Sequence, residues 1–405
     1  MKGNHSSEFF IETVGAFTSM DQDSMASSKP EVQSILEGLV SIASRHLQER
    51  DLQKTHHIIR ELGQGGFGSV LMVKEKRTGQ EMALKLLHRK KTAEFSFLME
   101  LSVSFFLSSH PNIISIYGVG FKTGEYFGYT QELATHGDLF DLISPDEGLP
   151  EDDVKRCAIQ ISSALDFMEG KGLVHLDIKP ENILVFNKDC HLIKITDFGL
   201  SQVKGSTTTR SSGTTSYMAP EMRQVSKQRP LVIDSSLDVW SFGVLLYILL
   251  TGEVPWQSAD PTDQEFCNFV GWQKNFGKID PPSLWRRLPP GVLRMFSGLL
   301  AIDYKRRSKC TEVLIFQDEC WKEDFAESDR SDEMENNSVV ESGPADIYLS
   351  NVSTTSILGV ESCYLTPGSC HGEEHPDHGT DINQSPLMFI DDEISVYVGA
   401  EVEIE

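Results

Sequence analysis

The chain has no long apolar run, few cysteines and no excess of basic residues. Its longest apolar stretch, 244–250, is too short to cross a bilayer. The apolar patch at 9–17 is interrupted by Glu12 and has no small-residue cleavage site after it, so no signal peptide is expected. Seven scattered cysteines without a C-x-x-C pair indicate reduced thiols in a cytoplasmic or nuclear protein. With 36 basic against 60 acidic residues, no surface for nucleic acid is expected.

The acidic excess is concentrated at the C-terminal end. From residue 318 onward there are 22 acidic and two basic residues, against 38 and 34 before that point. A nearly neutral body can bury a large core, whereas an acidic segment rich in Ser, Asn, Gly and Asp cannot offset its ordering entropy. We therefore predict a folded body at 56–317, an N-terminal extension at 1–55 and a tail at 318–405, disordered from 328 onward.

The N-terminal extension contains one helical pattern, predicted over 31–52. Pro30 suits a helix start, and the apolar residues that follow recur at helical spacing. Two interpretations stay open, packing on the neighbouring lobe or a docking or dimerisation helix. The apolar residues are Val32, Ile35, Leu36, Leu39, Ile42, Ala43 and Leu47.

The stretch 175–199, HLDIKPENILVFNKDCHLIKITDFG, holds four polar side chains that suit phosphoryl transfer. Asp177 can orient an attacking hydroxyl and accept its proton, and Lys179 can neutralise charge on the moving group. Asn182 and Asp197 offer the oxygen ligands that Mg²⁺ takes beside phosphate oxygens and water. A buried Asp or Asn capping a turn would explain one of these residues but hardly all four.

This spacing, D-x-K-x-x-N followed by D-F-G, resembles the catalytic loop and D-F-G loop of eukaryotic protein kinases. The resemblance covers about 56–317 and implies a bilobal α+β fold. A small lobe of five antiparallel strands and one helix (56–131) would be joined by a hinge (132–136) to a larger, mainly helical lobe (137–317). ATP and Mg²⁺ are the implied cofactors. In the larger lobe, helices are predicted over 138–143, 151–170 and 237–250.

A glycine-rich segment, G-x-G-x-x-G from Gly63 to Gly68, lies between two strand-like runs. Alone the motif is weak, and a dinucleotide-binding fingerprint would need a helix directly after it. A third strand-like run over 81–87 favours the kinase loop, in which backbone N–H groups approach phosphate oxygens. In the third run, Ala83 and Lys85 resemble the kinase A-x-K element.

The resemblance implies a carboxylate partner for Lys85 on the helix predicted over 92–108. Of Glu94 and Glu100 we select Glu100, which precedes the His110-Pro-Asn turn by ten residues. Adenine would be held by the hinge backbone, with Gln131 as gatekeeper. The predicted cofactor-binding residues are Leu62, Gly63, Gly65, Gly66, Phe67, Gly68, Val70, Ala83, Lys85, Glu100, Glu132 and Ala134.

Further matches concern scaffold and regulation. Asp238, in D-x-W-x-x-G, is expected to brace the catalytic-loop backbone, and Glu221 of A-P-E to pair with Arg307. The Arg usual before the catalytic Asp is replaced by Leu176, and the usual activation-loop phosphorylation position is Arg210. Because the phosphate acceptor and its clamp are both absent, we predict activity without activation-loop phosphorylation.

Segments such as Gly137-Asp-Leu-Phe-Asp and Trp285-Arg-Arg resemble the Src-homology-3-domain-binding serine/threonine kinases. The chain has no P-x-x-P, which argues against docking to Src-homology-3 domains. Lys179 is the serine/threonine form of the loop, so Ser/Thr protein substrates are implied, and Asp138 and Glu181 match positions that face upstream basic residues. The alternatives are a pseudokinase scaffold or allosteric binding module, favoured by Leu176, and a platform for the tail.

Overall fold

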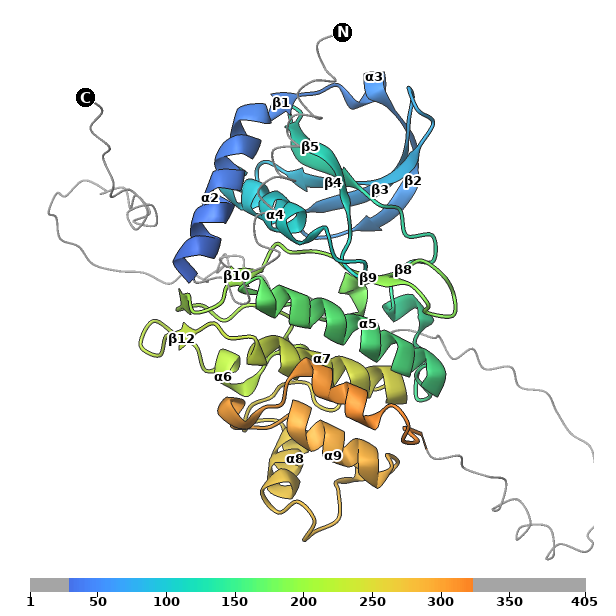
Figure 1. Ribbon diagram of the computed structural model, residues 1–405, viewed down its shortest axis with the longest axis vertical. Coiled ribbons are helices and arrows are strands. Elements are labelled where there is room, and N and C mark those ends of the chain that lie inside the picture. The colour runs from blue at the N-terminus through green and yellow to red at the C-terminus, as the bar shows by residue number, and fades with distance from the viewer. Residues whose placement is uncertain (1–28, 323–405) are drawn as a thin grey trace, which may run out of the picture. The chain divides into compact units, whose positions relative to one another are not determined.

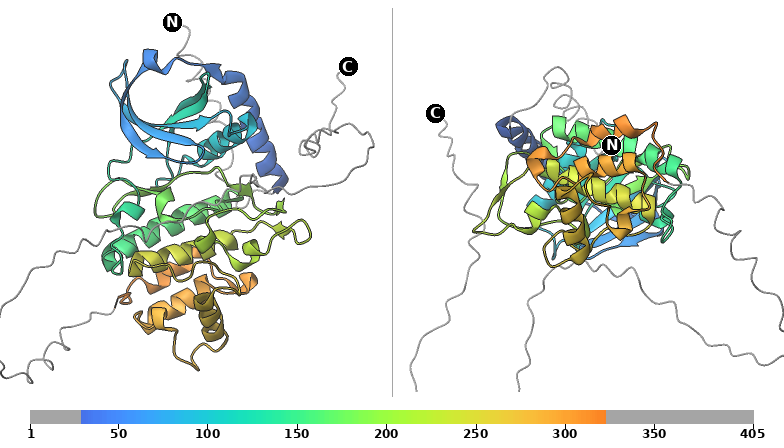
Figure 2. Two further views of the ribbon diagram at one scale, coloured as in Figure 1. Left: turned by 180° about the vertical axis from the view of Figure 1, so that it is seen from behind. Right: turned by 90° about the horizontal axis from the view of Figure 1, so that it is seen from below.

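The computed structural model describes residues 29–322, which form a strand-rich lobe and a helical lobe (Figures 1 and 2). This confirms the bilobal α+β architecture that the resemblance implies. The disorder predicted over 328–405 lies outside the described residues. Within the described part, no helix is both long and apolar enough to span a membrane, and the cysteines are free thiols.

The smaller lobe is built on one twisted sheet with the strand order β1-β5-β6-β4-β3-β2. The five predicted strands are present, pair antiparallel and alternate their side chains between the two faces. A sixth, two-residue strand, β1, adds to the edge parallel to β5 and was not predicted, because its exposed Gln and Glu carry no strand pattern. The strands are β1 (Gln48–Glu49), β2 (His56–Gln64), β3 (Gly68–Glu75), β4 (Glu81–His88), β5 (Ile116–Lys122) and β6 (Tyr126–Gln131).

Two helices cover one side of this sheet. The helix predicted over 92–108 is α4 (Glu94–Leu107), and the N-terminal helix is α2 (Lys29–His46), which packs on α4. The prediction that the N-terminal helix reaches residue 52 is wrong. After α2 the chain pairs with β5, and Asp51 then starts a separate turn, α3 (Leu52–Thr55), by accepting a hydrogen bond from the Gln53 N–H. The predicted apolar stripe of α2 is buried or half-buried along its length.

The larger lobe packs around α7, which is buried from end to end because it is apolar on every side. The helices predicted over 151–170 and 237–250 are confirmed, whereas the one predicted over 138–143 is a single 3-10 turn, η1 (Phe140–Leu142). The α-helices are α5 (Glu151–Gly170), α6 (Pro220–Arg223), α7 (Ser236–Thr251), α8 (Gln264–Lys274) and α9 (Pro290–Leu299). The other 3-10 turns are η2 (Pro180–Asn182), η3 (Thr215–Tyr217), η4 (Ser283–Trp285), η5 (Tyr304–Arg306) and η6 (Cys310–Phe316).

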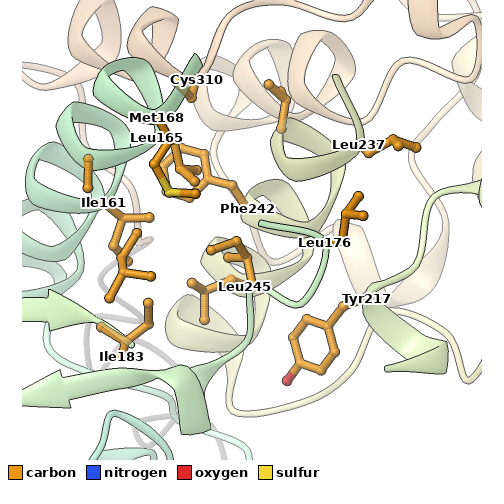
Figure 3. Packing of buried hydrophobic residues seen from close by; sticks show 14 of the residues in the cluster. Ile161, Leu165, Met168, Leu176, Ile183, Tyr217, Leu237, Phe242, Leu245 and Cys310 are labelled. Carbon is orange, nitrogen blue, oxygen red and sulfur yellow. The ribbon is translucent and has the colours of Figure 1, made fainter. Parts of the chain in front are cut away.

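Short antiparallel strand pairs fix the polar loops at the face between the lobes. β8 pairs with β9, β7 with β10, and β11 with β12. Leu176, which follows β7, is buried in the same core as Leu237 and Phe242 of α7 (Figure 3). These strands are β7 (Leu173–Val174), β8 (Ile183–Val185), β9 (Ile193–Ile195), β10 (Gln202–Val203), β11 (Thr207–Thr208) and β12 (Leu231–Val232).

The packed body continues past residue 317, where the resemblance ends. Trp321 is fully buried, and its indole N–H donates a 2.7 Å hydrogen bond to the Phe316 carbonyl. The Lys322 ammonium donates to the carbonyls of Glu147 and Leu149, just before α5. The first residues of the predicted tail therefore belong to the folded body.

Candidate active site

The catalytic-loop backbone is held by a buried carboxylate of α7. Asp238 accepts hydrogen bonds from the N–H groups of His175 at 2.6 Å and Leu176 at 2.8 Å, as predicted. Leu176 has a φ of +69°, a conformation that costs a non-glycine residue free energy. Burial raises the pKa of Asp238, although the two backbone donors favour its charged form. The Asp238 contacts therefore fix the turn from which the next residue, Asp177, projects.

Asp177 is at the centre of a hydrogen-bonded group. Its Oδ2 lies 2.9 Å from the Lys179 ammonium and accepts from the Asn182 amide at 3.0 Å. Its Oδ1 accepts from both the N–H and the hydroxyl of Thr214, at 3.1 and 2.8 Å. Burial opposes the charge of Lys179, but the Asp177 carboxylate outweighs it and raises the pKa of the ammonium. The predicted base, cation and amide are thus brought together within hydrogen-bonding distance.

Thr214 was not predicted as a site residue. Its hydroxyl donates to Asp177 and accepts from the Lys179 ammonium at 2.9 Å, so it bridges the two predicted catalytic side chains. The Gly213-Thr214 pair was visible in the sequence only as a landmark. Because 35 residues separate Thr214 from Lys179, only the folded activation segment, residues 197–221, reveals the contact.

Lys85 is held between carboxylates of two elements. Because side chains alternate along β4, Leu84 and Leu86 pack on one face of the sheet and Lys85 points to the other, toward α4. Its ammonium lies 2.7 Å from Glu100 Oε1 and 3.0 Å from Asp197 Oδ1. Glu100 is therefore the partner, as predicted.

The unselected carboxylate, Glu94, is directed away from Lys85. Its Oε2 lies 3.9 Å from the Lys122 ammonium at the edge of the sheet. A second residue missed from the sequence, Tyr129, donates a 2.8 Å hydrogen bond to Glu100 Oε1. It lies opposite Lys85 in the β4–β6 register, so the strand pairing places both side chains against the same carboxylate.

Lys85, Glu100 and Asp197 are held together by attraction between the ammonium and the two carboxylates. Burial alone would lower the pKa of Lys85, but Asp197 and Glu100 outweigh it and raise that pKa well above its ordinary value. The Lys85 ammonium in turn lowers the pKa of Asp197. Asp197 has a φ of +67° and a side chain that is 47% exposed, so part of its carboxylate is accessible to a ligand.

The glycine-rich loop is a β2–β3 hairpin, and the structural reason for glycine differs from one position to the next. A Cβ on Gly68 would lie 1.8 Å from the Leu86 carbonyl, so the close approach of β3 to β4 requires glycine there. Around Gly63, Gly65 and Gly66 a Cβ would meet open space, which leaves their backbone accessible to a ligand. The Lys91 ammonium donates to the Gly66 carbonyl at 2.8 Å.

Further predicted cofactor residues lie on the strands next to this loop and in the hinge. Val70 pairs with Lys85 in the β3–β4 register, and Ala83 pairs with Gln131, directly before the hinge. In the hinge, the Glu132 N–H is bonded to the Ser115 carbonyl and its carboxylate to Lys194 at 2.6 Å. The N–H of Ala134 makes no hydrogen bond within residues 29–322, so of the two hinge residues Ala134 has the N–H available to a ligand. The nucleotide-binding roles of these residues stay predictions.

The expected scaffold pair is present. Arg307 donates to both carboxylate oxygens of Glu221, at 2.7 and 3.2 Å, and also to the Ser236 carbonyl. Its guanidinium lies 5.0 Å from the centre of the Trp240 ring. A buried bidentate pair of this kind ties the end of the activation segment to the helical lobe.

Comparisons with known proteins agree with this geometry. The protein kinase domain family matches residues 56–317. Serine/threonine-protein kinase SBK1 of Danio rerio is 45% identical over 298 residues, covering 73% of this chain and 77% of the relative. SBK1 of Mus musculus is 44% identical over 283 residues (70% and 67%), and serine/threonine-protein kinase meng-po of Drosophila melanogaster is 38% identical over 271 residues (66% and 59%). The chain therefore belongs to the protein kinase family and is a serine/threonine protein kinase of the subfamily of SBK1.

Proposed function

We propose that this kinase transfers the γ-phosphoryl group of ATP to Ser or Thr hydroxyls with the help of Mg²⁺, and that it does so without phosphorylation of its activation segment. The observation that carries the proposal is the position of Lys85 between Glu100 and Asp197. A cation so aimed can hold the α- and β-phosphates of a nucleotide. Charge neutralisation and positioning supply most of the catalysis of phosphoryl transfer.

The chain's own groups account for the movement of the proton and the phosphoryl group. The substrate hydroxyl donates its proton to Asp177 as its oxygen bonds to the γ-phosphorus, and the bond from that phosphorus to the bridging oxygen of ADP breaks. Lys179, 2.9 Å from Asp177, lies where it can neutralise the transferred group. Both side chains come from one loop braced by Asp238, so their mutual geometry is fixed before substrate binds.

Asn182 and Asp197 are the residues that would hold Mg²⁺. An amide oxygen and an ionised carboxylate are hard ligands that suit this ion, which takes few protein ligands and completes its shell with phosphate oxygens and water. Bound there, the ion would neutralise charge on the β- and γ-phosphates.

Contacts between the activation segment and the rest of the helical lobe support the second half of the proposal. The segment is pinned by the β7–β10 and β11–β12 pairs and by the Thr214 contacts. Gly213, at φ +108°, packs so close to the catalytic loop that a Cβ would lie 2.7 Å from the Leu176 carbonyl. The Leu176 side chain is buried in the core and has no charge, so it cannot bind a phosphate on the activation segment as an arginine at this position would.

Acidic side chains beside the catalytic loop support a preference for basic residues upstream of the acceptor. Asp138 lies within electrostatic range of Asp141 and Glu181, and burial followed by the Asp141 charge raises its pKa to about 6. A carboxylate held among like charges is stabilised by a cationic partner, and Arg can pair with it bidentately. A peptide library without upstream Arg or Lys enrichment would remove this part of the proposal.

A pseudokinase that acts as a scaffold is the second candidate, and Leu176 is the observation that favours it. The intact contacts of Lys85 and Asp177 favour the enzyme, since the replaced Arg would touch a regulatory phosphate and not the reacting atoms. The two candidates predict different behaviour of the purified chain with Mg-ATP. A pseudokinase would transfer no phosphate at all.

Phosphate transfer should be measured for the wild-type chain, Asp177→Asn, Asp197→Ala and a matched Asp152→Asn variant, which changes an exposed carboxylate on α5. We expect wild-type turnover from Asp152→Asn, a loss of several orders of magnitude in Asp177→Asn with nucleotide affinity retained, and loss of productive nucleotide positioning in Asp197→Ala. Wild-type turnover in Asp177→Asn would contradict the assigned base. Nucleotide binding without any transfer by the wild-type chain would favour the scaffold.

A further inference from the structure

The helix that carries Glu100 cannot be covered by the sheet alone. Ten of its 14 residues are buried, and after Glu94 its only charged residue is Glu100 itself. A helix that is apolar on all sides must be covered on more than one face. The sheet covers one face, where Phe97 stacks on Phe127 with ring centres 5.0 Å apart and also packs against Gly120.

The second cover is α2, a helix that lies outside the matched kinase domain, which begins at residue 56. Four of its residues, Val32, Leu36, Leu39 and Ala43, recur at helical spacing and are each at most 5% exposed. They belong to the same apolar cluster as the core of α4. α2 packs across α4 in both side views (Figures 1 and 2).

α2 also reaches the start of the activation segment. Besides α4, it contacts β5 and β10, and its first turns lie beside β10 while its end leads into β1 (Figure 1). β10 begins at Gln202, five residues after Asp197. α2 therefore contacts α4, which carries Glu100, and the strand that follows the Asp197 loop; these two carboxylates lie 2.7 and 3.0 Å from the Lys85 ammonium.

We propose that α2 is a positioning element for the phosphoryl-transfer site. Its stripe, centred on Leu36 and Leu39, holds α4 in the place where Glu100 meets Lys85. This role rests on the proposed function, because it matters for catalysis only if Lys85 holds the phosphates of ATP. It supplies from within the chain the alignment that a phosphate on the activation segment would otherwise supply.

The first test is a double-mutant cycle in the full chain, with Leu36→Ala and Leu39→Ala combined as one change and Glu100→Gln as the other. Removing packing from buried leucines should shift α4 away from its aligned position and lower kcat/KM for ATP by about tenfold or more, with KM for the protein substrate unchanged. In the Glu100→Gln background, the two leucine substitutions should lower kcat/KM for ATP by less than about a further threefold. The effects of residues that act through the same contact are not additive. Leu36→Met should retain activity within about twofold.

A matched control separates alignment from general destabilisation. Leu293→Ala also removes packing from a buried leucine, but on α9 at the far end of the helical lobe (Figure 1). We expect it to lower thermal stability to a similar degree while kcat/KM stays within about twofold of wild type. An equal fall in both variants would show that α2 only stabilises the fold.

The second test does not depend on activity. Amide hydrogen exchange over residues 94–107 should be faster in the Leu36→Ala/Leu39→Ala chain than in wild type, while exchange in α9 is unchanged. Unchanged exchange in α4 would overturn the proposed role of α2. So would a double-mutant cycle in which the leucine substitutions lower kcat/KM by the same factor with and without Glu100→Gln. If the wild-type chain transfers no phosphate, the proposed function fails, and the exchange experiment still decides whether α2 holds α4.

Discussion

Replacing Thr214 by Val should slow phosphate transfer without unfolding the protein. The valine keeps the size of threonine but loses the hydroxyl that donates to Asp177 Oδ1 at 2.8 Å and accepts from Lys179 at 2.9 Å. The backbone N–H of residue 214 still donates to Asp177 at 3.1 Å, so the carboxylate keeps one of its contacts in this segment.

The size of this effect follows from the charged partners. A hydrogen bond to an ionised group contributes about 1.5–3 kcal/mol, and water can replace part of what is lost in an accessible cleft. If about 2 kcal/mol of alignment between Asp177 and Lys179 is lost, kcat falls roughly 30-fold. KM for ATP should change little, because Thr214 makes no contact with Lys85 or the glycine-rich loop among the hydrogen bonds of residues 29–322.

Steady-state assays of Thr214→Val, Thr214→Ser and wild type at saturating ATP give the measurement. Thr214→Ser keeps the hydroxyl and serves as the matched control, for which we expect kcat within about threefold of wild type. Wild-type kcat in Thr214→Val would refute the reasoning, and an equal loss in both variants would assign the effect to packing.

Three further outcomes follow from the same contacts. Tyr129→Phe removes the 2.8 Å hydrogen bond to Glu100 and should lower stability in a thermal-shift assay by about 1.5 kcal/mol, with kcat/KM for ATP reduced less than by Glu100→Gln; an unchanged melting temperature would contradict it. Trp321→Ala should lower the free energy of unfolding by about 3–5 kcal/mol in a denaturant titration, whereas deletion of 323–405 should leave the transition midpoint unchanged. An unchanged free energy of unfolding in Trp321→Ala would show that the folded body ends before residue 321. Because Asp138 has a raised pKa of about 6, it is mostly charged at pH 7.5 and loses most of its charge as the pH falls through 6. The preference for upstream Arg in a peptide panel should therefore weaken over this pH range, and in Asp138→Asn it should not change with pH.

The parts of the site that could be predicted are those whose functional residues lie close together in the sequence at a characteristic spacing. Asp177, Lys179 and Asn182 lie within six residues, and the choice of Glu100 over Glu94 needed only the helix and the turn that follows it. The long helices α5 and α7 were predicted from local signals, a Pro150 start followed by acidic residues for α5 and the D-x-W-x-x-G motif for α7.

The missed features depend on contacts between distant segments. Thr214 reaches Lys179 across 35 residues, and Tyr129 meets Glu100 only after β4 and β6 pair. The two-residue strand β1 has no pattern of its own and exists because β5 offers a free edge. Trp321 lies in an acidic stretch whose composition predicts a tail, yet its buried indole and the hydrogen bonds of Lys322 hold the first residues of this stretch on the body.

The central claim is that the chain aligns its own catalytic groups without a phosphate on the activation segment. The most direct test is to express the kinase domain together with α2 in bacteria, treat it with phosphatase, verify by mass that residues 206–216 carry no phosphate, and measure turnover with Mg-ATP and a protein substrate. We predict turnover equal to that of the untreated enzyme and loss of it in Asp177→Asn. An enzyme that is inactive after phosphatase treatment and regains activity only when phosphate returns to this segment would contradict the account.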